Sequence, residues 1–181
     1  MLVQVASFLN EDECNSLCRT YDRVHTAARQ HDYNGQPVID WGLIQSDSQI
    51  SALCRFIVQR VASLVETIQQ ENLHPETAVL AAMGPGHSFP LHADNCRNEE
   101  DEWVPNHTPN RLFSTILYLN DGYGGGEIVF PSQQQRIKPS TGLLVGFPSG
   151  RAYVHEVATV THGRRYSMPI WFAREGKALI R

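Results

Sequence analysis

The chain has 181 residues, of which 41% are hydrophobic and 19% charged, and a formal net charge of −4. This composition excludes collagen-like, coiled-coil and disordered chains. The acidic balance provides no basic footprint for nucleic acid, and no apolar run approaches the roughly 20 residues of a membrane span. The first residues lack the features of a signal peptide, and the four cysteines form no CxxC pattern. We therefore expect one cytoplasmic domain over residues 1–181, with reduced thiols and no nucleic-acid or membrane partner.

The amino-terminal part of the chain is expected to be helical. Asn10 is suited to cap a helix that begins at the next residue, and Glu13 would complete a capping box. A second helix is predicted from Ser46 or Asp47 to about Asn72. Apolar residues recur there at helical spacing, namely Ile50, Leu53, Ile57, Val61, Leu64, Val65 and Ile68. A single apolar stripe indicates packing on one side, against a sheet.

After the second helix the chain changes to short apolar runs separated by glycine, proline and asparagine clusters. The runs expected to form strands are Thr77–Met83, Arg111–Leu119, Glu127–Phe130, Gly142–Phe147, Ala152–Val157 and Arg165–Phe172. Many short strands at regular spacing predict a mainly β fold, either a sandwich or a jelly roll.

Two segments are candidates for loops that face a substrate. Asn95–Asn110 lacks strand character and contains four consecutive acidic residues, Glu99–Glu102. Long loops of this kind are often lids or binding loops, although a solvated acidic loop is the simpler interpretation. Asn34–Ile44 contains Trp41 between turn residues, and its alternative is an ordinary surface connection with a packed tryptophan.

A candidate metal site begins with His92 and Asp94. Residues i and i+2 of an extended chain point to the same face, so both side chains could bind one cation. His155, in an apolar strand-like stretch, offers a second imidazole. Two histidines and one carboxylate leave coordination positions open, as non-haem Fe(II) requires. Structural zinc uses four protein ligands, and with Cys96 close by a zinc site stays open as an alternative.

The last predicted strand contains a candidate anion site. Alternation places Arg165, Ser167, Pro169 and Trp171 on one face and Arg164, Tyr166, Met168 and Ile170 on the other. If the strand is half buried, one of the two arginines must face inward. A buried guanidinium needs a partner, because an unpaired buried charge is very costly. The carboxylate of a bound ligand could supply it through a bidentate contact, and an internal Asp or Glu is the alternative.

Motifs for these sites follow one another along the chain. They are His92-x-Asp94, Gly125-Gly126-Glu127 with Phe130-Pro131, His155-x-Val157-x-x-Val160-x-x-Gly163-x-Arg165-Tyr166, and Trp171. Their order resembles the prolyl-hydroxylase-like branch of the iron- and 2-oxoglutarate-dependent dioxygenases, over about Thr77 to Ala173. Within this branch, two stretches and one tryptophan are more similar to the prolyl 3-hydroxylase (leprecan-like) catalytic domains than to the 4-hydroxylases. They are His92-Ala93-Asp94-Asn95-Cys96, Ser114-x-Ile116-Leu117-Tyr118-Leu119-Asn120, and Trp103.

The resemblance implies a double-stranded β-helix (jelly roll) over residues 77–173, with the helices of residues 1–76 packed on one face. It implies that His92, Asp94 and His155 bind Fe(II). It also implies cofactor-binding positions in the same pocket, where Arg165 holds the distal carboxylate of 2-oxoglutarate, Ser114 helps at that carboxylate, and Tyr118 and Trp171 complete the surroundings.

The implied reaction uses 2-oxoglutarate and O2, releases succinate and CO2, and hydroxylates an aliphatic carbon of the substrate. The resemblance also allows for ascorbate as an accessory reductant. The substrate would be a prolyl residue in a peptide, a free amino acid or another small molecule, and the oligomeric state is left open.

Two departures from the family pattern support an alternative. Met83 and Phe89 stand where the family often has tyrosine, and neither provides a polar contact to the cosubstrate. A catalytically silent jelly-roll module, or one that only binds a metal, is therefore the second hypothesis.

Overall fold

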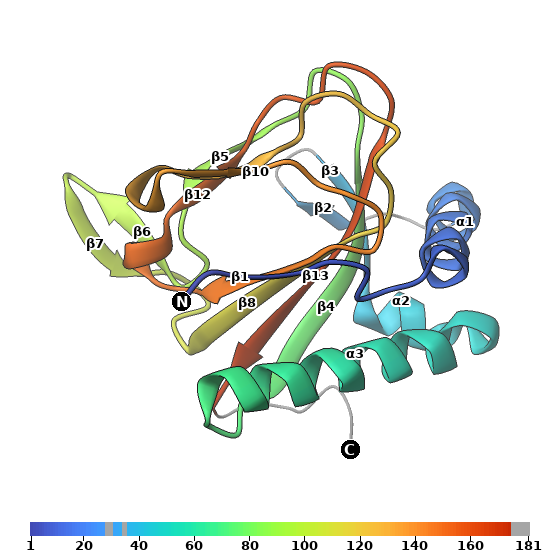
Figure 1. Cartoon of the computed structure of the whole chain (residues 1–181), viewed down its shortest axis with the longest axis horizontal. Coiled ribbons are helices and arrows are strands. Elements are labelled where there is room, and N and C mark those ends of the chain that lie inside the picture. Colours follow the sequence, from blue (N-terminus) through green and yellow to red (C-terminus); the bar gives the residue numbers. More distant parts are fainter. Residues whose placement is uncertain (28–30, 34–35, 175–181) are drawn as a thin grey trace.

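The computed structural model describes residues 1–27, 31–33 and 36–174, and its strands form two antiparallel sheets and a separate hairpin (Figure 1). In the described residues, the larger sheet has the order β1-β11-β8-β13-β4-β3-β2. These strands are β1 (Val3–Val5), β11 (Leu144–Pro148), β8 (Arg111–Tyr118), β13 (Arg165–Ala173), β4 (His74–Met83), β3 (Gln36–Asp40) and β2 (His31–Tyr33). This arrangement confirms the predicted mainly β, jelly-roll fold.

The smaller sheet has the order β10-β9-β12-β5. Its strands are β10 (Gln135–Ile137), β9 (Ile128–Phe130), β12 (His155–Val157) and β5 (Phe89–His92), and short 3-10 helices, η1 (Pro131–Gln133) and η2 (Arg151–Tyr153), precede β10 and β12. The run predicted as one strand over Ala152–Val157 is therefore a 3-10 turn followed by a short strand. That turn lets the chain enter β12 with His155 as its first residue.

The three α-helices are α1 (Glu11–Ala27), α2 (Trp41–Ser46) and α3 (Ser48–Gln69). The predicted capping box is present at α1, because the Asn10 amide donates to the Glu13 carboxylate and the Glu13 amide donates to the Asn10 side chain, both at 2.9 Å. Asp47 rather than Ser46 precedes α3, and its carbonyl accepts the amide of Ser51 at 2.9 Å. None of the described helices is both long and apolar enough to cross a membrane.

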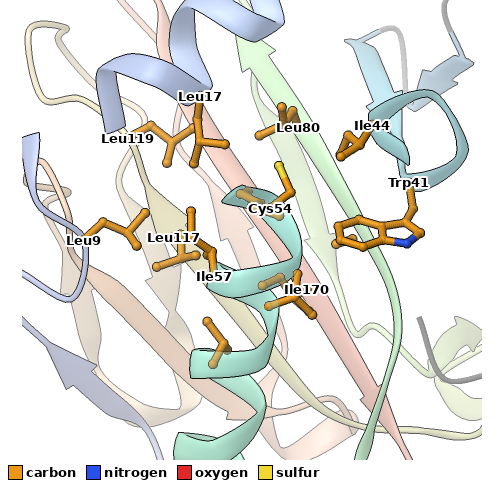
Figure 2. Packing of buried hydrophobic residues seen from close by; sticks show 14 of the residues in the cluster. Leu9, Leu17, Trp41, Ile44, Cys54, Ile57, Leu80, Leu117, Leu119 and Ile170 are labelled. Carbon is orange, nitrogen blue, oxygen red and sulfur yellow. The ribbon is translucent and has the colours of Figure 1, made fainter. Parts of the chain in front are cut away.

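The main hydrophobic core lies between the helices and the larger sheet. In Figure 2, Ile57 and Cys54 of α3 lie among Leu117 of β8, Leu80 of β4 and Ile170 of β13. All five side chains are fully buried. Burial of each large aliphatic side chain contributes about 1.5–3 kcal/mol, so this layer fixes the face of the sheet that the helices cover. The opposite face of the larger sheet is left for the cavity described below.

The segment before residue 77 contains strands as well as the expected helices. β1 pairs with β11 through Val3 and Gly146, and β3 pairs with β4 through Val38 and Ala81. Strands of three to five residues depend on pairing with strands that are distant in the sequence. The local pattern of residues therefore does not identify them. The candidate loop Asn34–Ile44 includes β3 and the start of α2, with residues 34 and 35 outside the described part. Trp41 is buried in the core, which supports the interpretation of a packed tryptophan.

The candidate loop Asn95–Asn110 contains a β-hairpin, formed by β6 (Cys96–Glu99) and β7 (Glu102–Pro105). The turn residues Glu100 and Asp101 have φ angles of 49° and 69°. Hairpin turns with two positive φ values usually contain asparagine or glycine, so this sequence gives no sign of the turn.

Candidate functional site

Two histidines from neighbouring strands of the smaller sheet face each other. His92 ends β5, His155 begins β12, and the two residues are paired in the register of these strands. Their ring centroids are 4.2 Å apart, and His92 Nε2 lies 3.6 Å from Asp94 Oδ1. Ligand atoms of His92, Asp94 and His155 all lie within 4.8 Å of one another. The structure thus brings together the three residues that the sequence indicated as metal ligands.

Backbone carbonyls fix the tautomers of both histidines. His92 Nδ1 lies 2.8 Å from the carbonyl oxygen of Pro90, and His155 Nδ1 lies 3.1 Å from that of Tyr153. A carbonyl only accepts, so each Nδ1 carries the proton. Each Nε2 then has a lone pair available for a metal ion.

Burial determines the charge of His155. Its ring is 4% exposed, and Phe147 and Phe130 lie at centroid distances of 4.6 and 5.5 Å. Desolvation lowers the pKa of His155 to about 4, although the nearby Asp94 opposes this shift. The imidazole is therefore neutral at neutral pH, which is the form that binds metals.

Asp94 is a buried carboxylate with hydrogen-bond donors around it. Burial alone would raise its pKa, but the neighbouring His92 and His155 and the hydroxyl of Ser114 outweigh burial and lower the pKa to about 2. Ser114 Oγ donates to Asp94 Oδ2 at 2.6 Å. The resemblance assigned Ser114 to the cosubstrate carboxylate, but here its only proton is already used on Asp94.

The donor set fits Fe(II). Two neutral imidazole nitrogens and one carboxylate oxygen on one side of a cation form the facial arrangement of non-haem iron oxygenases, with the other positions open. Among the described residues, Cys96 does not join this group. The zinc alternative with Cys96 as a fourth ligand therefore finds no support in the geometry.

Arg165 is buried without an acidic partner. The residue is 3% exposed. Its Nε donates to the Gly126 carbonyl at 3.2 Å, and its Nη1 donates to Ser167 Oγ at 3.0 Å. None of the ion pairs among the described residues includes Arg165, so the internal Asp or Glu considered from the sequence is absent there. Since an unpaired buried charge is very costly, this guanidinium fits a bound anion.

Two tyrosines lie near this guanidinium. The Arg165 guanidinium carbon lies 4.9 Å from the ring centroid of Tyr118. The hydroxyls of Tyr118 and Tyr123 are buried and make no hydrogen bond with other described residues. Unsatisfied buried hydroxyls are uncommon, but neither tyrosine is among the residues that line the cavity next to Arg165.

The metal ligands and Arg165 line one cavity. The predicted inner face of β13 is confirmed, since Arg165, Ser167, Pro169 and Trp171 all line it. Ser114 is a further lining residue, whereas Tyr118 contacts the Arg165 guanidinium but does not line the cavity. Most of the remaining wall is apolar, and includes Val38, Val79, Ala81, Phe89, Ile116, Phe147 and Val157.

Met83 and Phe89 contact the neighbouring functional groups at the positions where tyrosine is frequent in the family. Arg165 Nη1 donates a hydrogen bond to Met83 Sδ at 3.7 Å, and the centroid of the Phe89 ring lies 4.6 Å from that of His92. Met83 and Phe89 therefore contact Arg165 and His92, and both of these residues stay in the wall of the cavity.

The sequence reasoning missed Arg111 and Ser149. Arg111 lies over the Trp171 ring at 4.4 Å and pairs with Glu76 at 2.8 Å, and Ser149 Oγ lies 2.7 Å from Ser114 Oγ. Arg111 opens a predicted strand, and Ser149 lies within a turn signal, Pro148-Ser149-Gly150. Neither position has a local pattern that indicates function.

Comparison with known families agrees with this site. Residues 78–173 match the model of the 2OG-Fe(II) oxygenase superfamily, and the chain belongs to this superfamily. Membership of this superfamily implies a 2-oxoglutarate-dependent oxygenase that uses Fe(II), 2-oxoglutarate and O2. Within the superfamily, the chain is similar to prolyl hydroxylases.

The chain is similar to prolyl 3-hydroxylases in sequence. It is 38% identical to prolyl 3-hydroxylase 2 of Mus musculus over 95 residues, and 39% identical to prolyl 3-hydroxylase 3 of Homo sapiens over 93 residues. These matches cover 47% and 46% of this chain but only 13% of each relative. This chain therefore matches only a small part of the length of these relatives.

Solved structures of prolyl hydroxylases share the fold. A viral collagen prolyl hydroxylase from Paramecium Bursaria Chlorella virus-1 has a TM-score of 0.75 at 18% identity, covering 96% of both chains. A Pseudomonas putida prolyl-4-hydroxylase has a TM-score of 0.74 at 24% identity, covering 97% of this chain and 93% of that one. At these identities the likeness concerns the fold alone.

Proposed function

We propose that this protein hydroxylates an aliphatic carbon of a prolyl residue or of a free amino acid or similar small molecule. The overall reaction converts a substrate C–H bond, 2-oxoglutarate and O2 into the C–OH product, succinate and CO2. The observation that supports it most strongly is that a His-Asp-His group and Arg165, a buried arginine with no ion pair among the described residues, lie on the wall of one cavity.

Different residues of the cavity are proposed to bind the metal and the cosubstrate. His92, Asp94 and His155 would hold Fe(II). The bound metal would supply the chemistry that decarboxylates 2-oxoglutarate oxidatively and hydroxylates the substrate. Arg165 pairs with the distal carboxylate of 2-oxoglutarate through its fork of N–H donors. Ser167 orients the guanidinium by accepting from Nη1 at 3.0 Å.

The apolar wall supports an aliphatic substrate. Val38, Val79 and Trp171 present no charge to the cavity, and water exclusion by such side chains protects reactive species from side reactions. A prolyl ring is the first candidate, because the relatives with 38–39% identity are prolyl 3-hydroxylases. A free amino acid or other small molecule is the second.

A panel of proline-containing peptides and free amino acids tests this proposal. Mass spectrometry should detect a product one oxygen atom heavier than the substrate, in amounts matching the succinate formed. Asp94→Ala is the matched control and should form neither product. If the unaltered protein binds Fe(II) but forms no succinate with any candidate, the silent or metal-binding module becomes the better hypothesis.

An anaerobic titration tests the cosubstrate site separately. Addition of Fe(II) and then 2-oxoglutarate should produce a visible charge-transfer absorption that requires both additions and weakens in Arg165→Ala. Bound iron without such a band would contradict the proposed cosubstrate site.

A further inference from the structure

We propose that Ser149 is a positioning residue for the metal centre, acting through the hydroxyl of Ser114 to orient the carboxylate of Asp94. The inference rests on the proposed metal site. Ser114 and Ser149 are each 1% exposed, and Ser114 Oγ lies 2.6 Å from Asp94 Oδ2 and 2.7 Å from Ser149 Oγ. The two hydroxyls thus form a buried chain that ends on one oxygen of a metal ligand.

The direction of this hydrogen-bond chain follows from its end. A carboxylate that ligates a metal is ionised and only accepts hydrogen bonds, so Ser114 must donate to Asp94. A serine hydroxyl has a single proton, so Ser114 then accepts from Ser149. All O–H dipoles consequently point toward Asp94, and hydrogen bonds in such a chain strengthen one another.

These hydrogen bonds occupy one carboxylate oxygen of Asp94 and leave the other available to a metal ion. Oδ2 is occupied by Ser114, while Oδ1 faces the histidines and lies 3.6 Å from His92 Nε2. A carboxylate that turned about its side-chain torsion would lose the Ser114 hydrogen bond. Ser114 and Ser149 would therefore leave Oδ1 as the oxygen of Asp94 that is available to a metal ion.

The backbone of Ser149 holds the same segment independently. Its carbonyl oxygen accepts the amides of Asp94 at 3.0 Å and Asn95 at 3.2 Å, and its own amide donates to Leu112 at 3.0 Å. Replacement by alanine preserves these bonds and removes only the hydroxyl. Ser149→Ala is consequently a specific probe of the hydroxyl chain.

The test measures affinity for Co(II), used in place of Fe(II), by visible absorption without cosubstrate or substrate. Changes in partners of metal ligands typically cost 10–100-fold in affinity. We expect Ser114→Ala to weaken Co(II) binding by about 10-fold or more, and Ser149→Ala by roughly 3–10-fold. The d–d absorption of bound Co(II) should change in both variants.

A double-mutant cycle distinguishes a connected hydrogen-bond chain from independent effects of Ser114 and Ser149 on metal affinity. Because Ser149 acts through Ser114, adding Ser149→Ala to Ser114→Ala should weaken Co(II) binding no further. Ser114→Thr keeps the hydroxyl and should retain most of the affinity. The matched control is Thr20→Val, which removes a buried hydroxyl that donates to Ser16 on α1 and should leave Co(II) binding unchanged.

Unchanged Co(II) affinity and spectrum in Ser149→Ala would overturn the inference, as would additive effects in the cycle. If Ser149→Ala fails to fold, Ser149→Cys replaces it, with an intermediate effect expected because a thiol is a weak donor. The readout is independent of turnover. Tight, serine-dependent Co(II) binding in a protein that hydroxylates no substrate would contradict the proposed function and leave this inference standing.

Discussion

His92 and His155 are paired across β5 and β12, with ring centroids 4.2 Å apart. The register of these two strands therefore sets the distance between two metal ligands. β5 is the edge strand of the smaller sheet, so it is bonded within that sheet on one side only. A metal ion bound by both histidines and Asp94 would add a second connection between β5 and β12.

Metal binding should therefore stabilise the fold. At a free metal concentration of 100 times Kd, a ligand that binds only the folded state adds about 2.7 kcal/mol. We expect Co(II) to raise the Tm measured by circular dichroism and a chelator to reverse the rise. Asp94→Ala is the control, and an equal rise in that variant would argue against binding at these three residues.

The buried charge of Arg165 should control affinity for 2-oxoglutarate. Removal of one partner from a buried, hydrogen-bonded charge pair costs about 2–5 kcal/mol. Arg165→Ala should weaken 2-oxoglutarate binding accordingly, measured as the concentration that half-saturates the charge-transfer band. Arg165→Lys keeps the charge but loses the fork of donors, so its affinity for 2-oxoglutarate should lie between those of the unaltered protein and Arg165→Ala. Wild-type affinity in Arg165→Ala would show that the cosubstrate carboxylate binds elsewhere.

The metal-free protein should lose stability as the pH falls from 6.5 toward 4. Burial lowers the pKa of His155 from 6.5 to about 4, so in this window the unfolded chain binds a proton that the folded protein does not. The free energy of unfolding therefore decreases as the pH is lowered. The two pKa values, 6.5 unfolded and about 4 folded, give a decrease of about 3 kcal/mol. Urea unfolding at pH 7 and pH 4 measures this loss.

His155→Phe is the control for the pH effect, because it retains an aromatic ring against Phe130 and Phe147. Its stability should fall less between pH 7 and pH 4 than that of the unaltered protein. Equal losses in the two proteins would mean that other groups cause the pH dependence.

The cysteines should differ in reactivity. All four are free, as expected from the sequence, and Cys14 and Cys54 are fully buried. Burial raises the pKa of Cys14 to about 11 and that of Cys54 to about 12. Because the thiolate is the reactive form, iodoacetamide at pH 8 should label the partly exposed Cys96 first, as peptide mass spectrometry would report. Labelling of Cys54 as fast as Cys96 would indicate opening of α3.

The sequence by itself determined the features that depend on local spacing. The capping box of Asn10 and Glu13, the apolar stripe of α3 and the alternation that puts Arg165 and Trp171 on the same face follow from helix and strand periodicity. His92, Asp94 and His155 were predicted as metal ligands chiefly from the order of the family motifs, with the two-residue spacing and the strand-like setting of His155 in agreement.

Only the tertiary structure decided how distant segments meet. The pairing of His92 with His155 and the contact of Ser149 with Ser114 depend on strand register and on side-chain geometry that no short window of sequence specifies. β1, β3 and the hairpin of β6 and β7 were missed for a related reason. Strands this short depend on hydrogen bonds to a partner strand, and the hairpin turn has positive φ angles at Glu100 and Asp101 without the residues that usually accompany them.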